Sequence, residues 1–164
     1  MTAVEIARRT AVEHSERSKV DLRLNDPRIK RVLERRPQLD HSYDIPYVAG
    51  ASNDLTTLYI DRDFPIERIE DMRALWLHEA GEASFIRHFN DDYDTAHRLI
   101  TIAEKQLVEG HGKNWKAYDA PFRAYSKHAR HELIRRVPHD LFMAPYLQSG
   151  DAVLVRRMRA AMRR

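Results

Sequence analysis

Residues 65–110 decide the fold, and they read PIERIEDMRALWLHEAGEASFIRHF followed by NDDYDTAHRLITIAEKQLVEG. The first half predicts one long helix that is capped by Asp63, begins near Pro65 and frays by Asn90. The second half predicts a clean amphipathic helix over residues 95–109. The acidic turn between the two is short, so the helices are expected to pack side by side in antiparallel orientation.

Two polar residues fall inside the apolar stripe of the first helix, in the pattern H-E-x-x-E. At about 100° per residue, His78 and Glu82 lie one turn apart on one face. The same arc contains Leu75, Ile86 and Phe89, so both polar side chains are expected to be buried. A buried carboxylate without a partner costs several kcal/mol, and Glu82 therefore needs a cation, a hydrogen-bond donor or a proton.

The second helix presents a matching pair of polar residues. His97 and Glu104 share a largely apolar face with Ile100 and Val108. Because the two helices are neighbours, each with one His and one Glu on its buried side, the four side chains are expected to meet at one point. The chain has no cysteine, so a metal site in it must use imidazole and carboxylate ligands.

This cluster has two interpretations. In the first, His78, Glu82 and His97 bind zinc or another divalent metal, and Glu79 is the general base that acts on metal-bound water. Glu104 is then either a fourth metal ligand or the carboxylate that orients His97. Four protein ligands close a site, whereas three leave a position for water. In the second interpretation the same residues form a buried polar cluster without metal.

The rest of the chain surrounds this helix pair, and the whole is expected to be one mainly helical α+β domain. Extended, β-branched residues on either side of a Ser-Asn-Asp turn predict a β-hairpin. The expected segments are N-terminal helices in 1–42 (3–24 and 26–36), the hairpin in 43–62 (strands 43–51 and 56–61), the two metal-site helices in 63–110, and basic C-terminal helices in 111–164 (114–136 and 149–163).

Composition limits the classes of function. Of 164 residues, 43% are hydrophobic and 32% charged, which is typical of a folded domain and excludes wholesale disorder. No apolar run is long enough to span a membrane and the first 20 residues are highly charged, so a cytoplasmic protein without membrane contact is expected. The C-terminal arginines have no aromatic residues interleaved, which favours a solvated or partner-binding face over nucleic-acid binding.

The order of several motifs resembles a family of small phage- and prophage-encoded metallopeptidase-like proteins. The residues that carry the resemblance are Tyr47-Val48-Ala49-Gly50-Ala51-Ser52, Tyr59-Ile60-Asp61-Arg62, His78-Glu79-x-x-Glu82, Tyr93-x-x-Ala96-His97, Glu104 and Gly112-x-x-Trp115-x-x-Tyr118. The resemblance implies a zincin-like layout, in which an edge strand before the metal helix aligns an extended peptide. Glu82 stands where the common H-E-x-x-H pattern has a second His, and its negative charge makes water on the metal less acidic.

The sequence therefore predicts a zinc-dependent hydrolase of peptide or amide bonds, with a peptide or protein as substrate. The alternative is a non-enzymatic structural or interaction protein of phage origin, with a closed metal site or a metal-free polar cluster. Four other residues could reach the site as oxyanion or substrate contacts, but nothing in their spacing fixes this, and residues of these types are more often at the surface or at helix caps: Tyr118, His128, His131 and His139.

Overall fold

Helices dominate the computed structural model, which describes residues 2–129 and 134–163, and a small sheet completes it. The predicted α+β class, mainly helical with one small sheet, is confirmed. The elements in chain order are α1 (Ala3–Leu24), α2 (Pro27–Leu33), β1 (Gln38–Tyr43), β2 (Ala49–Ala51), β3 (Thr57–Asp61), a 3-10 turn η1 (Ile66–Arg68), α3 (Met72–Phe89), α4 (Tyr93–Gly110), α5 (Trp115–Ala129), α6 (Ala144–Gln148) and α7 (Ala152–Met162).

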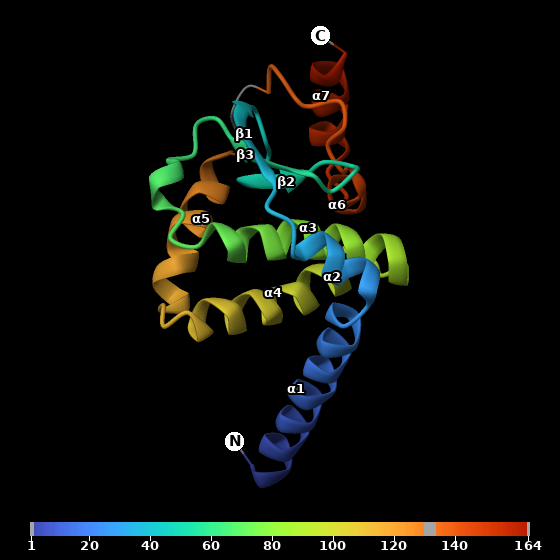
Figure 1. Cartoon of the computed structure of the whole chain (residues 1–164), viewed down its shortest axis with the longest axis vertical. Helices are drawn as coiled ribbons and strands as arrows, with labels where there is room; N and C mark the ends of the chain where they lie inside the picture. The colour runs from blue at the N-terminus through green and yellow to red at the C-terminus, as the bar shows by residue number, and fades with distance from the viewer. Residues whose placement is uncertain (1, 130–133, 164) are drawn as a thin grey trace.

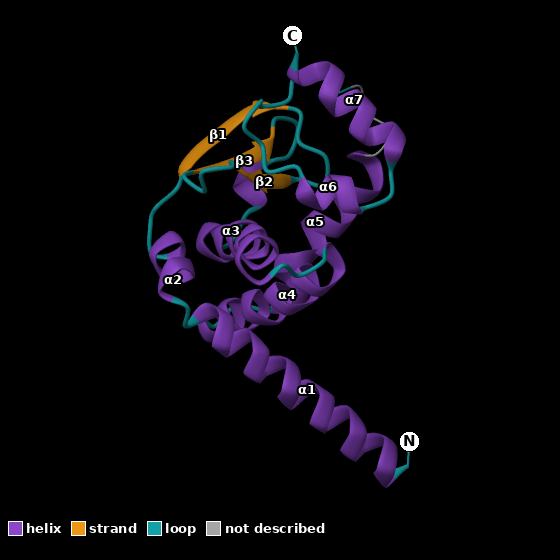
Figure 2. Cartoon of the chain, turned by 90° about the vertical axis from the view of Figure 1, so that its right-hand side faces the viewer, coloured by secondary structure: helices purple, strands orange, loops and turns teal. Residues whose placement is uncertain are grey.

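The sheet is sandwiched between helices, as Figure 2 shows. Its strand order is β1-β3-β2, with β1 parallel and β2 antiparallel to the central strand. Side chains alternate along β3: Leu58 and Ile60 enter the core cluster that contains Trp76 of α3. Tyr59 joins the cluster on the opposite face, which contains Met158 of α7. Both faces of the sheet are therefore covered, which holds β2 against the middle of α3.

The α3–α4 pair forms the lower layer of the molecule, and the predicted antiparallel packing of these two helices is confirmed (Figure 1). Phe85 of α3 and Leu99 of α4 are fully buried in a shared cluster. The backbones approach most closely at Gly81, where an added Cβ would lie 2.3 Å from Cδ1 of Ile100. A side chain at position 81 would therefore separate the helices that carry the candidate site.

The long helix α1 runs away from the other elements, with the N-terminus at its far end (Figures 1 and 2). Its C-terminal part holds it to α4: Val20 is buried in the cluster below α3 and α4. Arg23 also makes a two-pronged ion pair, at 2.9 Å, with Asp91 in the α3–α4 turn. Among the described residues, no helix is long and apolar enough to cross a membrane.

The sheet differs from the predicted hairpin in two ways. Of the expected first strand, residues 49–51 pair with β3 as β2, and Tyr43 pairs with β3 as the last residue of β1. Residues 44–48 between them form a turn, in which the backbone N–H of Ile45 donates to Oδ2 of Asp61 at 2.8 Å. The strand β1 was not predicted; its sequence, QLDHSY, is largely polar, and its pairing with β3 spans a long stretch of chain. The second N-terminal helix, expected over 26–36, is shorter: α2 spans Pro27–Leu33, and the side chain of Asp26 caps its start.

The helix that carries His78 and Glu82 also begins later than predicted. Residues 66–68 make one 3-10 turn, and α3 begins at Met72 with Asp71 rather than Asp63 as its cap. Burial would raise the pKa of Asp71, but hydrogen bonds from His111, from the backbone of Ala74 and from Lys113 outweigh burial and lower that pKa. The cap is thus fixed by residues that lie about 40 positions away in the sequence.

The C-terminal helices are shorter than predicted. The helix expected over 114–136 is described as α5 to residue 129, and residues 130–133 lie outside the described part. The helix expected over 149–163 begins at Ala152, where the side chain of Asp151 caps it. Pro145 starts a short extra helix, α6, instead of breaking one, since proline fits the first helical turn.

Candidate metal centre

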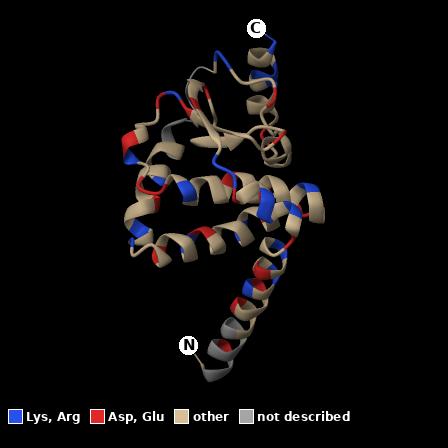
Figure 3. Ribbon diagram, in the orientation of Figure 1, with Lys and Arg blue, Asp and Glu red and all other residues tan. Residues whose placement is uncertain are grey.

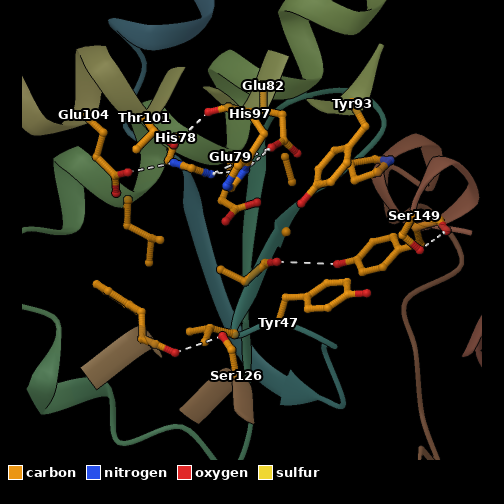
Figure 4. Close-up of a pocket in the computed structure, with 18 of the residues that line it drawn as sticks. Tyr47, His78, Glu79, Glu82, Tyr93, His97, Thr101, Glu104, Ser126 and Ser149 are labelled. Atoms are coloured by element: carbon orange, nitrogen blue, oxygen red, sulfur yellow. Dashed lines mark hydrogen bonds and ion pairs between the residues drawn. The ribbon is translucent and has the colours of Figure 1, made fainter. Parts of the chain in front are cut away.

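Three side chains from α3 and α4 converge on one point, as Figure 4 shows. His78 and Glu82 lie one turn apart on α3, and His97 approaches from the first turns of α4. Oε2 of Glu82 lies 2.8 Å from Nδ1 of His97 and 3.8 Å from Nε2 of His78. The two imidazole nitrogens are 3.3 Å apart. The three residues predicted as metal ligands therefore meet, and they form a group that could hold a metal ion.

The shape of this triangle fits a divalent ion. Sides of 2.8, 3.3 and 3.8 Å place all three atoms around a common centre at a distance of about 2 Å, which is the usual bond length from zinc to nitrogen or oxygen. Two imidazoles and one carboxylate are also the donor set of many catalytic zinc sites. Burial differs among the three: Glu82 is buried, whereas the side chain of His97 is 46% exposed, so the group opens on one side.

Glu104 contacts the other histidine from the one expected. Its Oε2 lies 2.7 Å from Nδ1 of His78, on the side of the ring away from the group, and it does not orient His97. Its Oε1 accepts a 2.8 Å hydrogen bond from the hydroxyl of Tyr118 on α5. A carboxylate on the far nitrogen of a ligating histidine fixes the tautomer and leaves the other nitrogen free for metal. Glu104 is thus placed to orient His78.

The sequence held a signal for this pairing. In two antiparallel helices, a residue later in the second helix lies opposite a residue earlier in the first. Because the helices are antiparallel, residues that follow His97 in α4 lie beside residues that precede Glu82 in α3, so Glu104 is on the His78 side of the contact between His97 and Glu82. Tyr118 was assigned a surface or capping role, yet it is buried and carries this second hydrogen bond.

Electrostatic effects in the ion-free cluster are large. Burial alone would lower the pKa of His78, but the Glu104 carboxylate outweighs burial and raises that pKa to about 10. Burial raises the pKa of Glu79 to about 8; the charge of His78 opposes this rise, while Glu82 and Glu104 add to it. Excess negative charge is therefore concentrated here, and a divalent cation would relieve it.

Glu79 lies beside the group without belonging to it. Its side chain points into the cleft next to the two imidazoles in Figure 4, and it lines the same cavity. Among the described residues it has no hydrogen-bonding side chain as a fixed partner. This is the position that the sequence predicts for a general base.

The group sits in a cleft of about 840 Å³ that extends to both sides of it. On one side the walls come from α5 and include Trp115 and Phe122; on the other they come from α6 and include Tyr146 and Ser149. Strand β2 forms the floor between them. A cleft that continues past the ligands on both sides can accept an extended chain.

The edge strand implied by the resemblance is present but short. The carbonyl of Ala51 already accepts a hydrogen bond from Phe142 N at 2.9 Å, and Ser52 forms a bridge with Leu141. The part of β2 that lines the cleft ahead of these contacts is Ala49 and Gly50. A substrate could therefore pair with only a few backbone groups of this edge.

The turn that leads into β2 has an unusual backbone. Tyr47 and Val48 have φ values of 73° and 103°, and for a β-branched residue such a positive φ is a true outlier. The turn brings the ring of Tyr47 into the cleft, where it stacks on Tyr146 with centroids 5.7 Å apart. Strained residues of this kind cluster at binding sites, where the surrounding structure holds them in place.

Of the other histidines named from the sequence, His139 is described and lies outside the group. His139 is exposed, His131 lies outside the described residues, and nothing is stated of the side chain of His128. Tyr93 is a residue that sequence reasoning did not single out for the site: its ring lies 5.4 Å from that of His97 and its hydroxyl points into the cleft (Figure 4). Burial, together with Glu82 and Glu79, raises the pKa of Tyr93 and keeps it protonated.

Comparisons with protein-family models, with curated proteins and with solved structures found no match to this chain.

Proposed function

We propose that the protein is a zinc-dependent hydrolase that cleaves a peptide or amide bond, as the motif order also implies. The observation that carries the proposal is the convergence of His78, Glu82 and His97 around one centre in an open cleft, with Glu79 beside it. An ion held by these three side chains would polarise a substrate carbonyl and make a coordinated water more acidic.

The residues of the chain have separate tasks in this proposal. Glu104 holds His78 with Nε2 directed at the centre. The positive charge of a bound ion would lower the raised pKa of Glu79 and favour its ionised form. Glu79 could then accept the proton released when water attacks the carbonyl and deliver it to the departing amine, since one carboxyl can serve as base and then as acid. The protonated hydroxyl of Tyr93 faces the same space and can donate a hydrogen bond to the oxygen that gains negative charge.

Metal content is the first test. Protein purified without a histidine tag and offered zinc is expected to retain about one equivalent by elemental mass spectrometry, whereas His78→Ala should retain almost none. The control is His139→Ala, which removes an exposed histidine outside the cleft. Retention of zinc by His78→Ala, or none in the unaltered protein, would rule out this metal centre.

Catalysis is tested separately with Glu79→Gln. This variant is expected to keep its zinc but to lose cleavage of a quenched fluorescent peptide library, because glutamine cannot accept the proton. Glu109→Gln, an exposed change on α4, is the matched control. Equal turnover by both variants would remove Glu79 from the mechanism.

The non-enzymatic alternative is favoured by one feature: hydrogen bonds already satisfy the cluster without an ion. His78 bonds to Glu104, His97 to Glu82, and Tyr118 to Glu104. In that case a chelator leaves the melting temperature unchanged. A hydrolase with bound zinc should instead lose both activity and several degrees of melting temperature on chelation.

A further inference from the structure

Exposed arginines gather at the end of the molecule opposite to the N-terminus. Figure 3 shows blue segments on α7 and on the loop beside it, near the C-terminus. All six described arginines of this region are exposed. We call them the C-terminal arginine surface: Arg135, Arg136, Arg156, Arg157, Arg159 and Arg163.

The fold brings two separate parts of the chain together here. Ile134 and Val137 pack in the same cluster as Leu154 and Met158 of α7, which places the intervening arginines beside that helix. The loop is held firmly, because Asp44 accepts hydrogen bonds from the backbone N–H groups of Arg135 and Arg136 at 2.6 and 2.8 Å. The arginines are therefore presented from a fixed backbone.

Several arginines elsewhere in the fold have a carboxylate partner. Arg23, Arg62, Arg98 and Arg123 each form an ion pair with a carboxylate. Within residues 2–129 and 134–163, no ion pair is found for any member of the C-terminal arginine surface. The nearby carboxylate of Asp44 is already engaged by Arg62 at 2.7 Å in addition to the two backbone donors.

The helix dipole of α7 explains the position of only some of these arginines. Positive side chains in the last turn of a helix interact favourably with its dipole, which accounts for Arg159 and Arg163 on α7. It does not account for Arg156 and Arg157 in the middle of the helix. Nor does it account for Arg135 and Arg136, because they lie in a loop and not in the last turn of a helix.

We infer that the C-terminal arginine surface binds the phosphate backbone of a nucleic acid. Arg156, Arg159 and Arg163 recur every three or four residues, so they follow one another about 5 Å apart along the outer side of α7 and can reach successive phosphates. Guanidinium groups also match phosphate oxygens in pairs, which ammonium groups do not.

One further observation separates nucleic acid from another anionic partner, a membrane. A membrane surface fits less well: the apolar residues of α7, which an interfacial helix would insert into lipid, are buried in the protein at Leu154, Met158 and Ala161.

The test is fluorescence anisotropy of the full chain with labelled 20-nucleotide single-stranded DNA, duplex DNA and RNA, at several salt concentrations. The triple variant R156A/R159A/R163A is expected to bind the preferred nucleic acid at least tenfold more weakly and to lower the salt slope by about 2 to 3. The control, R73A/K105A/K116A, removes the same charge from exposed positions on α3, α4 and α5 and should change binding less than twofold.

Several results would overturn the inference. They are the absence of binding to all three nucleic acids at 50 mM salt, an equal loss in both triple variants, tighter binding to anionic lipid vesicles, and equal competition by polyglutamate. Glu79→Gln should bind nucleic acid like the unaltered protein. A failure of the proposed hydrolase activity would therefore leave this inference standing, and the reverse is also true.

Discussion

Replacing Gly81 by alanine tests the packing that brings the two metal-site helices together. An added Cβ would lie 2.3 Å from Cδ1 and 2.9 Å from Cγ1 of Ile100, whereas ordinary van der Waals contacts begin near 3.4 Å. Ile100 is fully buried, so its side chain cannot move aside by about 1 Å without disturbing its neighbours. The clash is expected to push α4 outward.

The magnitude follows from two opposing terms. Alanine is a better helix former than glycine by about 1 kcal/mol, which favours the variant. Overpacking a tight core costs about 1–3 kcal/mol, and two clashing carbons place this site in the upper part of that range. The net expectation for Gly81→Ala is a loss of about 1–2 kcal/mol in the free energy of unfolding, with weaker zinc binding because His97 lies on the displaced helix.

Urea unfolding of four proteins measures this effect: the unaltered chain, Gly81→Ala, Ile100→Val and the double variant. Ile100→Val alone should cost about 1 kcal/mol, because it leaves a small cavity. In the double variant the new methyl group fills the space that Cδ1 vacated. Its loss in the free energy of unfolding should therefore be about 1 kcal/mol smaller than the sum of the two single losses.

Two results would refute this reasoning. A Gly81→Ala variant as stable as the unaltered protein would mean that α3 and α4 are not packed as closely as described. Strict additivity in the double variant would mean that the lost stability does not come from the contact with Ile100.

Other predictions concern the hydrogen bonds around the site and the cap of α3. Glu104→Gln should weaken zinc binding about 10- to 100-fold, because His78 loses the carboxylate that fixes its tautomer; competition with a chromophoric chelator measures it. Tyr118→Phe should give a smaller loss in the same assay, and a larger one would contradict this order. Because the pKa of His78 is raised to about 10 in the ion-free protein, its proton must leave before zinc binds, so zinc affinity should rise about tenfold per pH unit between pH 7 and 9; a flat profile in that assay argues against His78 as a ligand. Asp71→Ala should lower the free energy of unfolding by about 1–2 kcal/mol at pH 7. Since the pKa of Asp71 is lowered on folding, that difference in urea unfolding should disappear as the pH falls through the lowered pKa, and a constant difference down to pH 2 would disprove the assignment.

The meeting of three side chains could be predicted from sequence because helical periodicity is local. His78 and Glu82 share a face by spacing alone, and the short turn at residues 90–92 fixes which helix lies opposite. The orientation of an imidazole ring is not local. It depends on Glu104 and on Tyr118, which a third helix contributes. The convergence of the three side chains was therefore easier to predict than the hydrogen bonds that orient them.

The errors in the sheet have a similar cause. The strand β1 carries few apolar residues and exists because it pairs with β3, a partner that local propensity does not reveal. The turn at Tyr47 and Val48 was predicted as strand, since both residues favour extended backbone, yet buried hydrogen bonds to Asp61 hold it in another conformation.

The hydrogen-bonded chain from Tyr118 through Glu104 to His78 joins α5, α4 and α3. An ion that binds one orientation of His78 also stabilises the packed position of α5, and the packed position of α5 in turn raises the affinity for the ion. Ion binding should then slow amide hydrogen exchange in α5, although that helix supplies none of the three ligands. A partner that binds the exposed side of α5 and weakens its packing would in turn lower the affinity for the ion.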